Sequence, residues 1–160
     1  MTRVSPDDPS RPDVVALLSA HLAFAAATSP PEDVHALDLS GLLDPSVSFF
    51  SVRVEEALVA IGALKQLDPS HVEVKSMHTA AAFRGQGFAR VMLDHLVSEA
   101  RSRGCSRISL ETGSMKEFAP ARTLYGSVGF VECEPFDSYA ASPHSTFMTL
   151  PLTPSRVRDR

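Results

Sequence analysis

Cysteine is scarce in this chain of 160 residues: it contains two, Cys105 and Cys133, and they form no CxxC pair. This spacing excludes a disulfide scaffold and a cysteine-based metal site. The six histidines show no HExxH or comparable ligand spacing, so we expect no bound metal. Basic residues are also outnumbered, because 15 Lys and Arg stand against 19 Asp and Glu and leave a net charge of −4. That balance argues against nucleic acid as a partner.

Long apolar runs are missing as well. The longest candidate, residues 14–27, contains His21 and falls short of the roughly 18–20 residues that span a membrane. Residues 1–8 lack the apolar segment of a secretion signal, so we expect a cytoplasmic protein with no membrane contact. Because 44% of the residues are hydrophobic and 21% are charged, the chain can bury a core. We expect one domain over residues 1–160, with its core at about 11–150 and a polar tail at 153–160.

Hydrophobic periodicity and turn residues divide the chain into helices and strands. Pro12 opens an apolar run with helical spacing, and Gly104 and Gly129 each follow a helical pattern. Residues 32–43 fit either a short helical turn or a loop. The other expected elements, in chain order, are a helix over 12–28, strands over 46–54, 58–67 and 72–79, a helix over 88–103, a strand over 108–110, a helix over 118–128, and strands over 130–134 and 145–150. This order predicts an α/β fold with a mixed, mostly antiparallel sheet flanked by helices.

The most informative segment is a glycine-rich turn between the third expected strand and the long helix. Such a turn lets backbone N–H groups converge at a helix N-terminus, where they favour an anion such as a phosphate. A P-loop is excluded because no lysine follows Gly87 before Lys116. A dinucleotide-binding turn is disfavoured because Arg90 stands where a third small residue is needed. The alternative is a turn that uses glycine for its geometry alone. The segment reads Arg84-Gly85-Gln86-Gly87-Phe88-Ala89.

This segment has the form Q/R-x-x-G-x-G/A and resembles the pyrophosphate-binding signature of the GNAT superfamily, the acyl-CoA-dependent N-acyltransferases. Residues 121–130 are similar to the A-x-x-L-Y-x-x-x-G-F segment of that family, and the order of elements matches the family fold over about residues 11–150. The resemblance implies a GNAT-like sheet with a central splayed strand pair, acetyl-CoA as the cofactor, and a homodimer as one option. One departure is Phe118, which stands where many members carry an asparagine that touches the cofactor or orders the helix.

The resemblance also assigns cofactor-binding residues. In the strand over 72–79, the backbone of Met77 and Thr79 would hold the pantetheine arm and polarise the thioester carbonyl. The glycine-rich turn would bind the pyrophosphate. The full implied set is Met77, His78, Thr79, Arg84, Gly85, Gln86, Gly87, Phe88 and Ala89.

Three side chains are candidates for proton transfer. Attack of an amine on a thioester is helped by a base for the amine and an acid for the departing thiolate. Glu73, eleven residues before Arg84, is expected as the base through a water, and Glu111 at the end of the next strand is its competitor. Tyr125 is expected as the acid, because the family directs this hydroxyl toward the sulfur and a phenol is neutral near pH 7. The alternatives are a structural Glu73 paired with Lys75 and a packed Tyr125.

The acceptor pocket is expected between residues 29–35 and 134–139, whose prolines and aromatic residues make stiff walls. Arg53, Lys65 and Lys75 bear on the acceptor class: two of them facing inward would suit an acceptor with a carboxylate, whereas dominance of the two glutamates would suit a plain amine. The expected function is transfer of an acetyl group from acetyl-CoA to the amine of a small-molecule or amino-acid-like acceptor. A non-catalytic acyl-CoA-binding sensor or regulatory module is the alternative.

Overall fold

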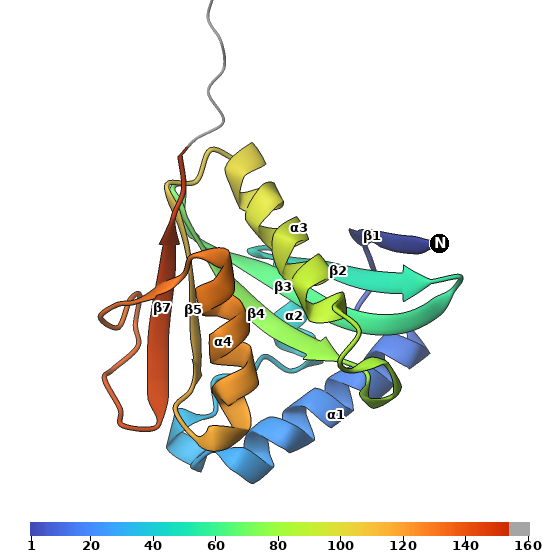
Figure 1. The fold of residues 1–160 in the computed structure, drawn as a ribbon, viewed down its shortest axis with the longest axis horizontal. Helices are drawn as coiled ribbons and strands as arrows, with labels where there is room; N and C mark the ends of the chain where they lie inside the picture. Colours follow the sequence, from blue (N-terminus) through green and yellow to red (C-terminus); the bar gives the residue numbers. More distant parts are fainter. Residues whose placement is uncertain (154–160) are drawn as a thin grey trace, which may run out of the picture.

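A computed structural model describes residues 1–153, which form a seven-stranded sheet with its helices packed against it (Figure 1). The strands lie in the order β1-β2-β3-β4-β5-β7-β6, and every neighbouring pair is antiparallel except β4 and β5. The expected α/β class and mostly antiparallel sheet are therefore confirmed. The strands are β1 (Thr2–Pro6), β2 (Val47–Val54), β3 (Ala57–Asp68), β4 (His71–Thr79), β5 (Arg107–Gly113), β6 (Val131–Glu132) and β7 (Ser145–Pro151). The helices are α1 (Pro12–Thr28), α2 (Leu39–Leu42), α3 (Phe88–Ser102) and α4 (Ala119–Val128), with short 3-10 turns at η1 (Pro31–Asp33), η2 (Ala81–Phe83) and η3 (Lys116–Phe118).

Two hydrophobic clusters hold the helices against opposite faces of the sheet. Met92 of α3 is fully buried in one cluster, together with Ala60 of β3. Val14 of α1 is fully buried in the other, together with Ile61 of the same strand. The adjacent residues Ala60 and Ile61 belong to different clusters because successive side chains of a strand point to opposite faces. Helices α3 and α4 thus cover one face of the sheet, and α1 covers the other (Figure 1).

All the helices and strands that the sequence predicts are present, with ends shifted by a few residues. Helix α1 begins at Pro12, in the first turn, where the missing N–H of proline costs no helical hydrogen bond. Helix α3 is followed by Gly104, which adopts a left-handed φ of 78°.

Two short elements were not expected from the sequence. Strand β1 pairs with β2 from Thr2 to Pro6, so the sheet extends beyond the expected core of residues 11–150. It lies at the edge of the sheet, which is where a strand tolerates proline. Helix α2 begins after Asp38, whose carboxylate accepts a hydrogen bond from the Gly41 N–H at 2.9 Å. Aspartate is a preferred N-cap residue, so Asp38 was the available signal for this helix.

The central strands β4 and β5 separate after a short contact. They pair only where residues 71–73 lie beside residues 107–109. Beyond this point β4 continues along β3 through a β-bulge, in which Gly62 of β3 lies opposite both Ser76 and Met77. Ser76 adopts a positive φ of 58°, and bulges of this kind re-aim a strand near functional sites. The expected splayed strand pair is confirmed.

The C-terminal end of the described chain packs onto the core. Leu152, which follows β7, is buried with the residues beneath α3. Of the polar tail expected at 153–160, residues 154–160 lie outside the described residues. No helix formed by residues 1–153 is long and apolar enough to cross a membrane.

Candidate active site

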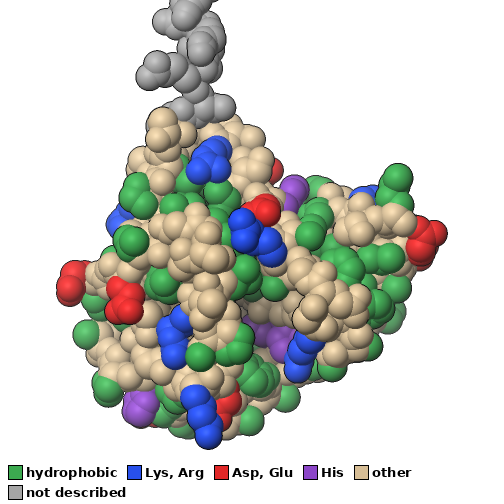
Figure 2. All heavy atoms as spheres, viewed as in Figure 1, with side chains coloured by type: hydrophobic (Ala, Val, Ile, Leu, Met, Phe, Trp, Pro, Cys, Tyr) green, Lys and Arg blue, Asp and Glu red, His purple; other side chains and the backbone are tan. Residues whose placement is uncertain are grey.

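The separated ends of β4 and β5 open into a cavity of about 640 Å³. Its walls come from α1, the segment around η1, β4, the glycine-rich loop, the start of α3, β5 and α4. Figure 2 shows the molecule hollowed between α3 and α4, with a histidine visible in the hollow. The volume falls within the range of roughly 300–1,000 Å³ that is usual for small-molecule sites. This cavity is the candidate active site.

The glycine-rich loop contributes to the wall of this cavity. Gly85 and Gly87 have φ values of 76° and 87°, in a left-handed region that other residues rarely adopt. Gly87 is the N-cap of α3, and no side chain caps this end of the helix. A β-carbon at either glycine would meet no atom within 4 Å, so a ligand has room to approach the backbone. These features fit a phosphate group at the N-terminus of α3.

Most of the residues expected to bind the cofactor lie in the cavity wall. Gln86 is the exception: it is exposed in the loop and does not line the cavity. The Arg84 side chain donates a hydrogen bond from Nε to the Thr79 carbonyl at 3.4 Å, which links the loop to the end of β4. Arg90, for which the sequence indicated no role, lines the cavity from the first turn of α3. The expected residues that do line it are Met77, His78, Thr79, Arg84, Gly85, Gly87, Phe88 and Ala89.

Tyr125 projects from α4 into the cavity wall and is 8% exposed. Its hydroxyl has no hydrogen-bond partner within residues 1–153, although its ring packs near Phe130, with centroids 5.9 Å apart. Burial, with a further contribution from the negative charge of Glu111, raises the pKa of Tyr125 to about 12. The phenol therefore keeps its proton near neutral pH and is able to donate it.

Glu111 lines the same cavity from β5 and is half-buried. Burial raises the pKa of the Glu111 carboxyl above the usual range for glutamate. A carboxylate with a raised pKa is a stronger base, and catalytic bases are commonly tuned in this direction.

Glu73, the residue expected as the base, is placed differently. It is 2% exposed and does not line the cavity. The Tyr139 hydroxyl donates to its carboxylate at 2.5 Å, and the Lys75 ammonium lies 3.4 Å from the same oxygen. These contacts fit the alternative given by the sequence, in which Glu73 is a structural residue paired with Lys75. Tyr139 received no individual role from the sequence, although residues 134–139 were expected in the pocket wall.

Lys75 ties together the two segments that were expected to wall the acceptor pocket. Its ammonium donates to the His35 carbonyl at 3.0 Å and to the Tyr139 hydroxyl at 2.9 Å. The ring of His35 meets that of Tyr139 edge-on, with centroids 4.8 Å apart. A second link joins the Ser142 hydroxyl to the Asp33 carboxylate at 2.9 Å. The segment around η1 and the loop between β6 and β7 therefore meet above β4.

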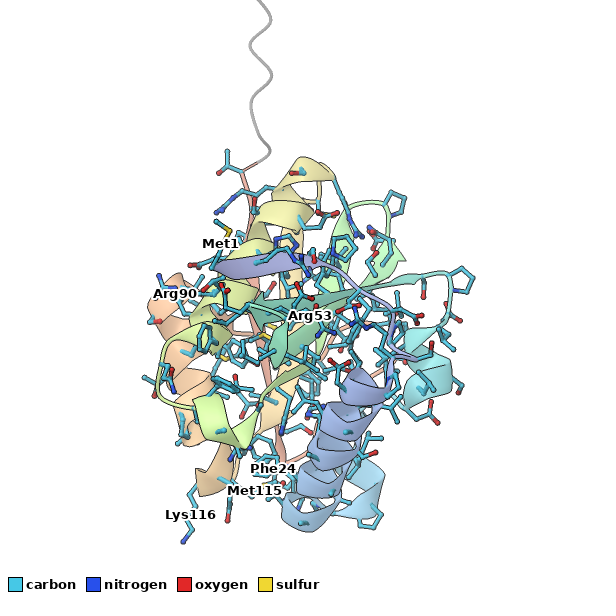
Figure 3. The ribbon with its side chains drawn as sticks, turned by 90° about the vertical axis from the view of Figure 1, so that its right-hand side faces the viewer. Met1, Phe24, Arg53, Arg90, Met115 and Lys116 are labelled. Carbon is cyan, nitrogen blue, oxygen red and sulfur yellow. The ribbon has the colours of Figure 1, made fainter. Side chains whose placement is uncertain are left out.

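The other two expected cations do not reach the cavity. Arg53 is 2% exposed and forms ion pairs with Asp7 at 3.0 Å and Asp13 at 2.7 Å, which bind the segment after β1 and helix α1 to β2. In Figure 3 it lies beyond the N-terminal end of α1, whereas Phe24 lies toward the other end of that helix. Lys65 is half-buried on β3 and is not part of the cavity wall. Of the three, only Lys75 lines the cavity.

An aromatic wall closes part of the cavity. Phe24 of α1 and Phe118 of η3 meet with ring centroids 5.3 Å apart. The Nδ1 atoms of His21 and His78 lie 3.2 Å apart beside them, and both histidines line the cavity. Phe118, the departure from the family pattern, thus stands in the wall in place of a polar amide.

Comparisons with known proteins agree with this geometry. The model of the acetyltransferase (GNAT) family matches residues 14–130. The uncharacterised N-acetyltransferase YsnE of Bacillus subtilis is 47% identical over 91% of this chain and 97% of its own length. The IAA acetyltransferase of Azospirillum brasilense is 32% identical over 93% of this chain and 97% of its own.

Solved structures give the same result. A Klebsiella pneumoniae protein assigned to the acyl-CoA N-acyltransferases superposes with a TM-score of 0.80 and 28% identity, covering 96% of this chain and 99% of that one. A Bacillus subtilis acetyltransferase in complex with CoA has the same fold, with a TM-score of 0.72, 15% identity and coverage of 96% and 100%. Family model, relatives and fold therefore bear out the resemblance seen in the sequence: this chain belongs to the GNAT family and is an acyl-CoA-dependent N-acetyltransferase.

Proposed function

We propose that this enzyme transfers an acetyl group from acetyl-CoA to the primary amine of a small molecule, with Glu111 as the base and Tyr125 as the acid. The observation that carries the proposal is that these two side chains line one cavity, where the charge of Glu111 contributes to the raised pKa of Tyr125. A raised carboxyl pKa suits the acceptance of a proton, and a neutral buried phenol suits its donation.

The cavity fits acetyl-CoA in two respects. The uncapped N-terminus of α3, with open space above Gly85 and Gly87, suits the pyrophosphate, and the arginines at 84 and 90 add positive charge beside it. The backbone of Met77 and Thr79 lines the cavity where β4 has left β5, which suits the pantetheine arm and the thioester carbonyl. When bound, acetyl-CoA supplies the activated acetyl thioester.

The proton transfers balance with these two residues. Glu111 accepts one proton from the ammonium form of the acceptor through a water and passes it to solvent, which frees the nitrogen lone pair. The C–N bond forms and the C–S bond breaks. Tyr125 donates its phenolic proton to the sulfur and recovers a proton from the acylated nitrogen through water. The products are an amide, a thiol and one proton in solvent.

We propose Glu111 rather than Glu73 as the base because the acceptor in the cavity can reach its carboxylate. A base must come within hydrogen-bond reach of its proton donor, directly or through one water. Glu111 lines the cavity, whereas Glu73 is covered by Lys75 and Tyr139.

A small-molecule acceptor is supported by the volume of the cavity, about 640 Å³, which is usual for small-molecule sites. Lys75 bonds to the His35 carbonyl and to the Tyr139 hydroxyl, so the two segments that carry these residues are held together beside the cavity. The name of the 32% identical relative, IAA acetyltransferase, also supports a small-molecule acceptor, without indicating its acylated group. The homodimer expected as one option remains a prediction, which light scattering in solution will test.

The test is thiol release from acetyl-CoA with a panel of amines. The Glu111→Gln variant should lower kcat by about 100-fold, the size typical of losing a general base. Glu73→Gln should retain most of the activity if its carboxylate only pairs with Lys75. The reverse ranking of the two variants would restore Glu73 as the base. Thermal stabilisation of every variant by CoA serves as the control for folding and cofactor binding.

A further inference from the structure

The lysines and arginines around the cavity offer no free cation to an acceptor. The described residues that line the cavity include one lysine, Lys75, and two arginines, Arg84 and Arg90. The two arginines belong to the glycine-rich loop and the start of α3, where the pyrophosphate is proposed to bind. Lys116 precedes Phe118 by two positions, but its side chain points away from the molecule (Figure 3).

Lys75 is fully engaged by the protein. An ammonium has three N–H donors. They are matched by the His35 carbonyl at 3.0 Å, the Tyr139 hydroxyl at 2.9 Å and the Glu73 carboxylate at 3.4 Å. Glu73 also neutralises its charge. An acceptor carboxylate would have to displace one of these partners in order to bind Lys75.

Negative groups are available instead. Glu111 and Asp33 both line the cavity, and the exposed Glu117 lies at its margin. The Asp33 Oδ2 atom accepts a hydrogen bond from Ser142, while Oδ1 has no partner within residues 1–153. These carboxylates attract an ammonium and repel a second carboxylate.

The remaining wall is aromatic and uncharged. Phe24 and Phe118 present a pair of rings, and His21 and His78 extend this surface. Burial lowers the pKa of both histidines, so each ring is neutral at pH 7. Such a surface suits an apolar or aromatic body and is compatible with a nearby ammonium.

We infer that the acceptor is an arylalkylamine that carries no carboxylate, with its ring against Phe24 and Phe118 and its amine toward Glu111. This inference rests on the proposed function and narrows it, because it excludes the amino-acid-like acceptors that the sequence left open. The distinguishing feature is the engagement of Lys75 by Tyr139, Glu73 and the backbone of the segment around η1.

The experiment compares matched pairs of acceptors in the thiol-release assay: 2-phenylethylamine with L-phenylalanine, tyramine with L-tyrosine, and tryptamine with L-tryptophan. We expect kcat/KM to be about 100-fold higher for each amine than for its amino acid, because the carboxylate would be desolvated beside carboxylates without a partner. Short peptides and L-lysine complete the panel.

A variant tests the aromatic wall. Phe24→Ala removes a ring that is 36% exposed, so the fold should tolerate the change. We expect KM for 2-phenylethylamine to rise by about 10-fold, as for loss of an aromatic contact, with KM for acetyl-CoA unchanged. Val131→Ala, at an exposed position on β6 outside the cavity wall, is the matched control and should leave both values unchanged.

The outcomes separate this inference from the proposed function. Equal or faster acetylation of the amino acids, or turnover confined to peptides or lysine, would overturn the inference while the acetyltransferase activity stands. Absence of turnover with every acceptor would overturn both. A preference for the arylalkylamines that Phe24→Ala weakens and Val131→Ala preserves supports the inference.

Discussion

The Tyr139 hydroxyl donates a hydrogen bond to the Glu73 carboxylate at 2.5 Å, although 66 positions separate the two residues in sequence. The bond joins the loop between β6 and β7 to the central strand β4. Lys75 contacts both partners and lines the cavity, so the three side chains form one polar cluster at the cavity wall. This cluster fixes the loop and satisfies the buried Glu73 carboxylate. Of the glutamates on β4 and β5, Glu111 therefore lines the cavity and Glu73 does not.

Loss of this bond should destabilise the protein. Tyr139→Phe removes a hydrogen bond to a charged acceptor, so the free energy of unfolding should fall by about 1.5–3 kcal/mol, as measured by urea denaturation. Ser138→Ala, at the exposed neighbouring position, should change it little. Equal unfolding midpoints for wild type and Tyr139→Phe would show that the bond contributes nothing to stability.

The sequence predicted the three longer helices, every strand except β1, and the glycine-rich loop, because these depend on local patterns. It also placed Glu73 and Lys75 on one face of β4, from the alternation of the strand. The sequence did not indicate that Tyr139 covers this face, because Tyr139 lies in a loop that is distant from β4 along the chain. Local pattern therefore indicated the strands and the loop that line the cavity, whereas the proposal of Glu111 in place of Glu73 as the base depends on tertiary contacts.

The same limit applies to the charges. Arg53 stands on a strand where the sequence permitted an inward-facing cation, but Asp7 and Asp13 bind it from the N-terminal segment. The residues around Asp7 have the prolines and acidic side chains of a loop, and β1 forms because β2 presents an open edge to it. Pairing of this kind has no local signature.

Tyr125→Phe should separate chemistry from binding. The change removes the proposed proton donor and keeps the ring that packs near Phe130. We expect kcat to fall by about 100-fold, with the Kd for CoA within a factor of two of the wild type. An unchanged kcat would remove Tyr125 from the mechanism, and calorimetric titration with CoA supplies the binding constant.

The ionised Glu111 carboxylate should lower the free energy of unfolding at neutral pH, because burial disfavours its charge. Burial raises its pKa in the folded state, so its contribution to stability is complete below the unfolded-state pKa and is lost as the pH rises through the folded-state value. Glu111→Gln should therefore be more stable than wild type at pH 7.5, and the difference should shrink toward pH 4. Urea unfolding at the two pH values measures this. A variant less stable at pH 7.5 would contradict the burial of a charged Glu111.

The histidine pair should make the fold sensitive to acid. Burial, reinforced by His78, lowers the pKa of His21 to about 4. Because the unfolded-state pKa is near 6.5, stability present above that value is lost as the pH falls toward 4. Between pH 7 and pH 4, the free energy of unfolding of His21→Leu should fall by about 2 kcal/mol less than that of the wild type. The control variant His144→Leu, at an exposed position, should show the same fall as the wild type. Identical pH profiles for all three proteins would refute this.

Valine substitutions at two glycines with similar backbone angles distinguish the effect of backbone strain from the loss of CoA binding. Gly87 and Gly104 have φ values of 87° and 78°, and a β-carbon at either would meet no atom within 4 Å. Valine at each position should destabilise the fold by about 1–2 kcal/mol because of its left-handed conformation. Gly87→Val should in addition abolish CoA binding, whereas Gly104→Val, at the other end of α3, should retain it. Equal CoA affinities in the two variants would show that the loop is not the phosphate site.

The most direct test of the catalytic assignment is thiol release from acetyl-CoA with 2-phenylethylamine, measured for wild type and Glu111→Gln under saturating acetyl-CoA. We expect amine-dependent turnover by the wild type and about 100-fold less by the variant, with equal thermal stabilisation of both by CoA. Equal turnover by the two proteins would contradict the assignment of Glu111 as the base of this site.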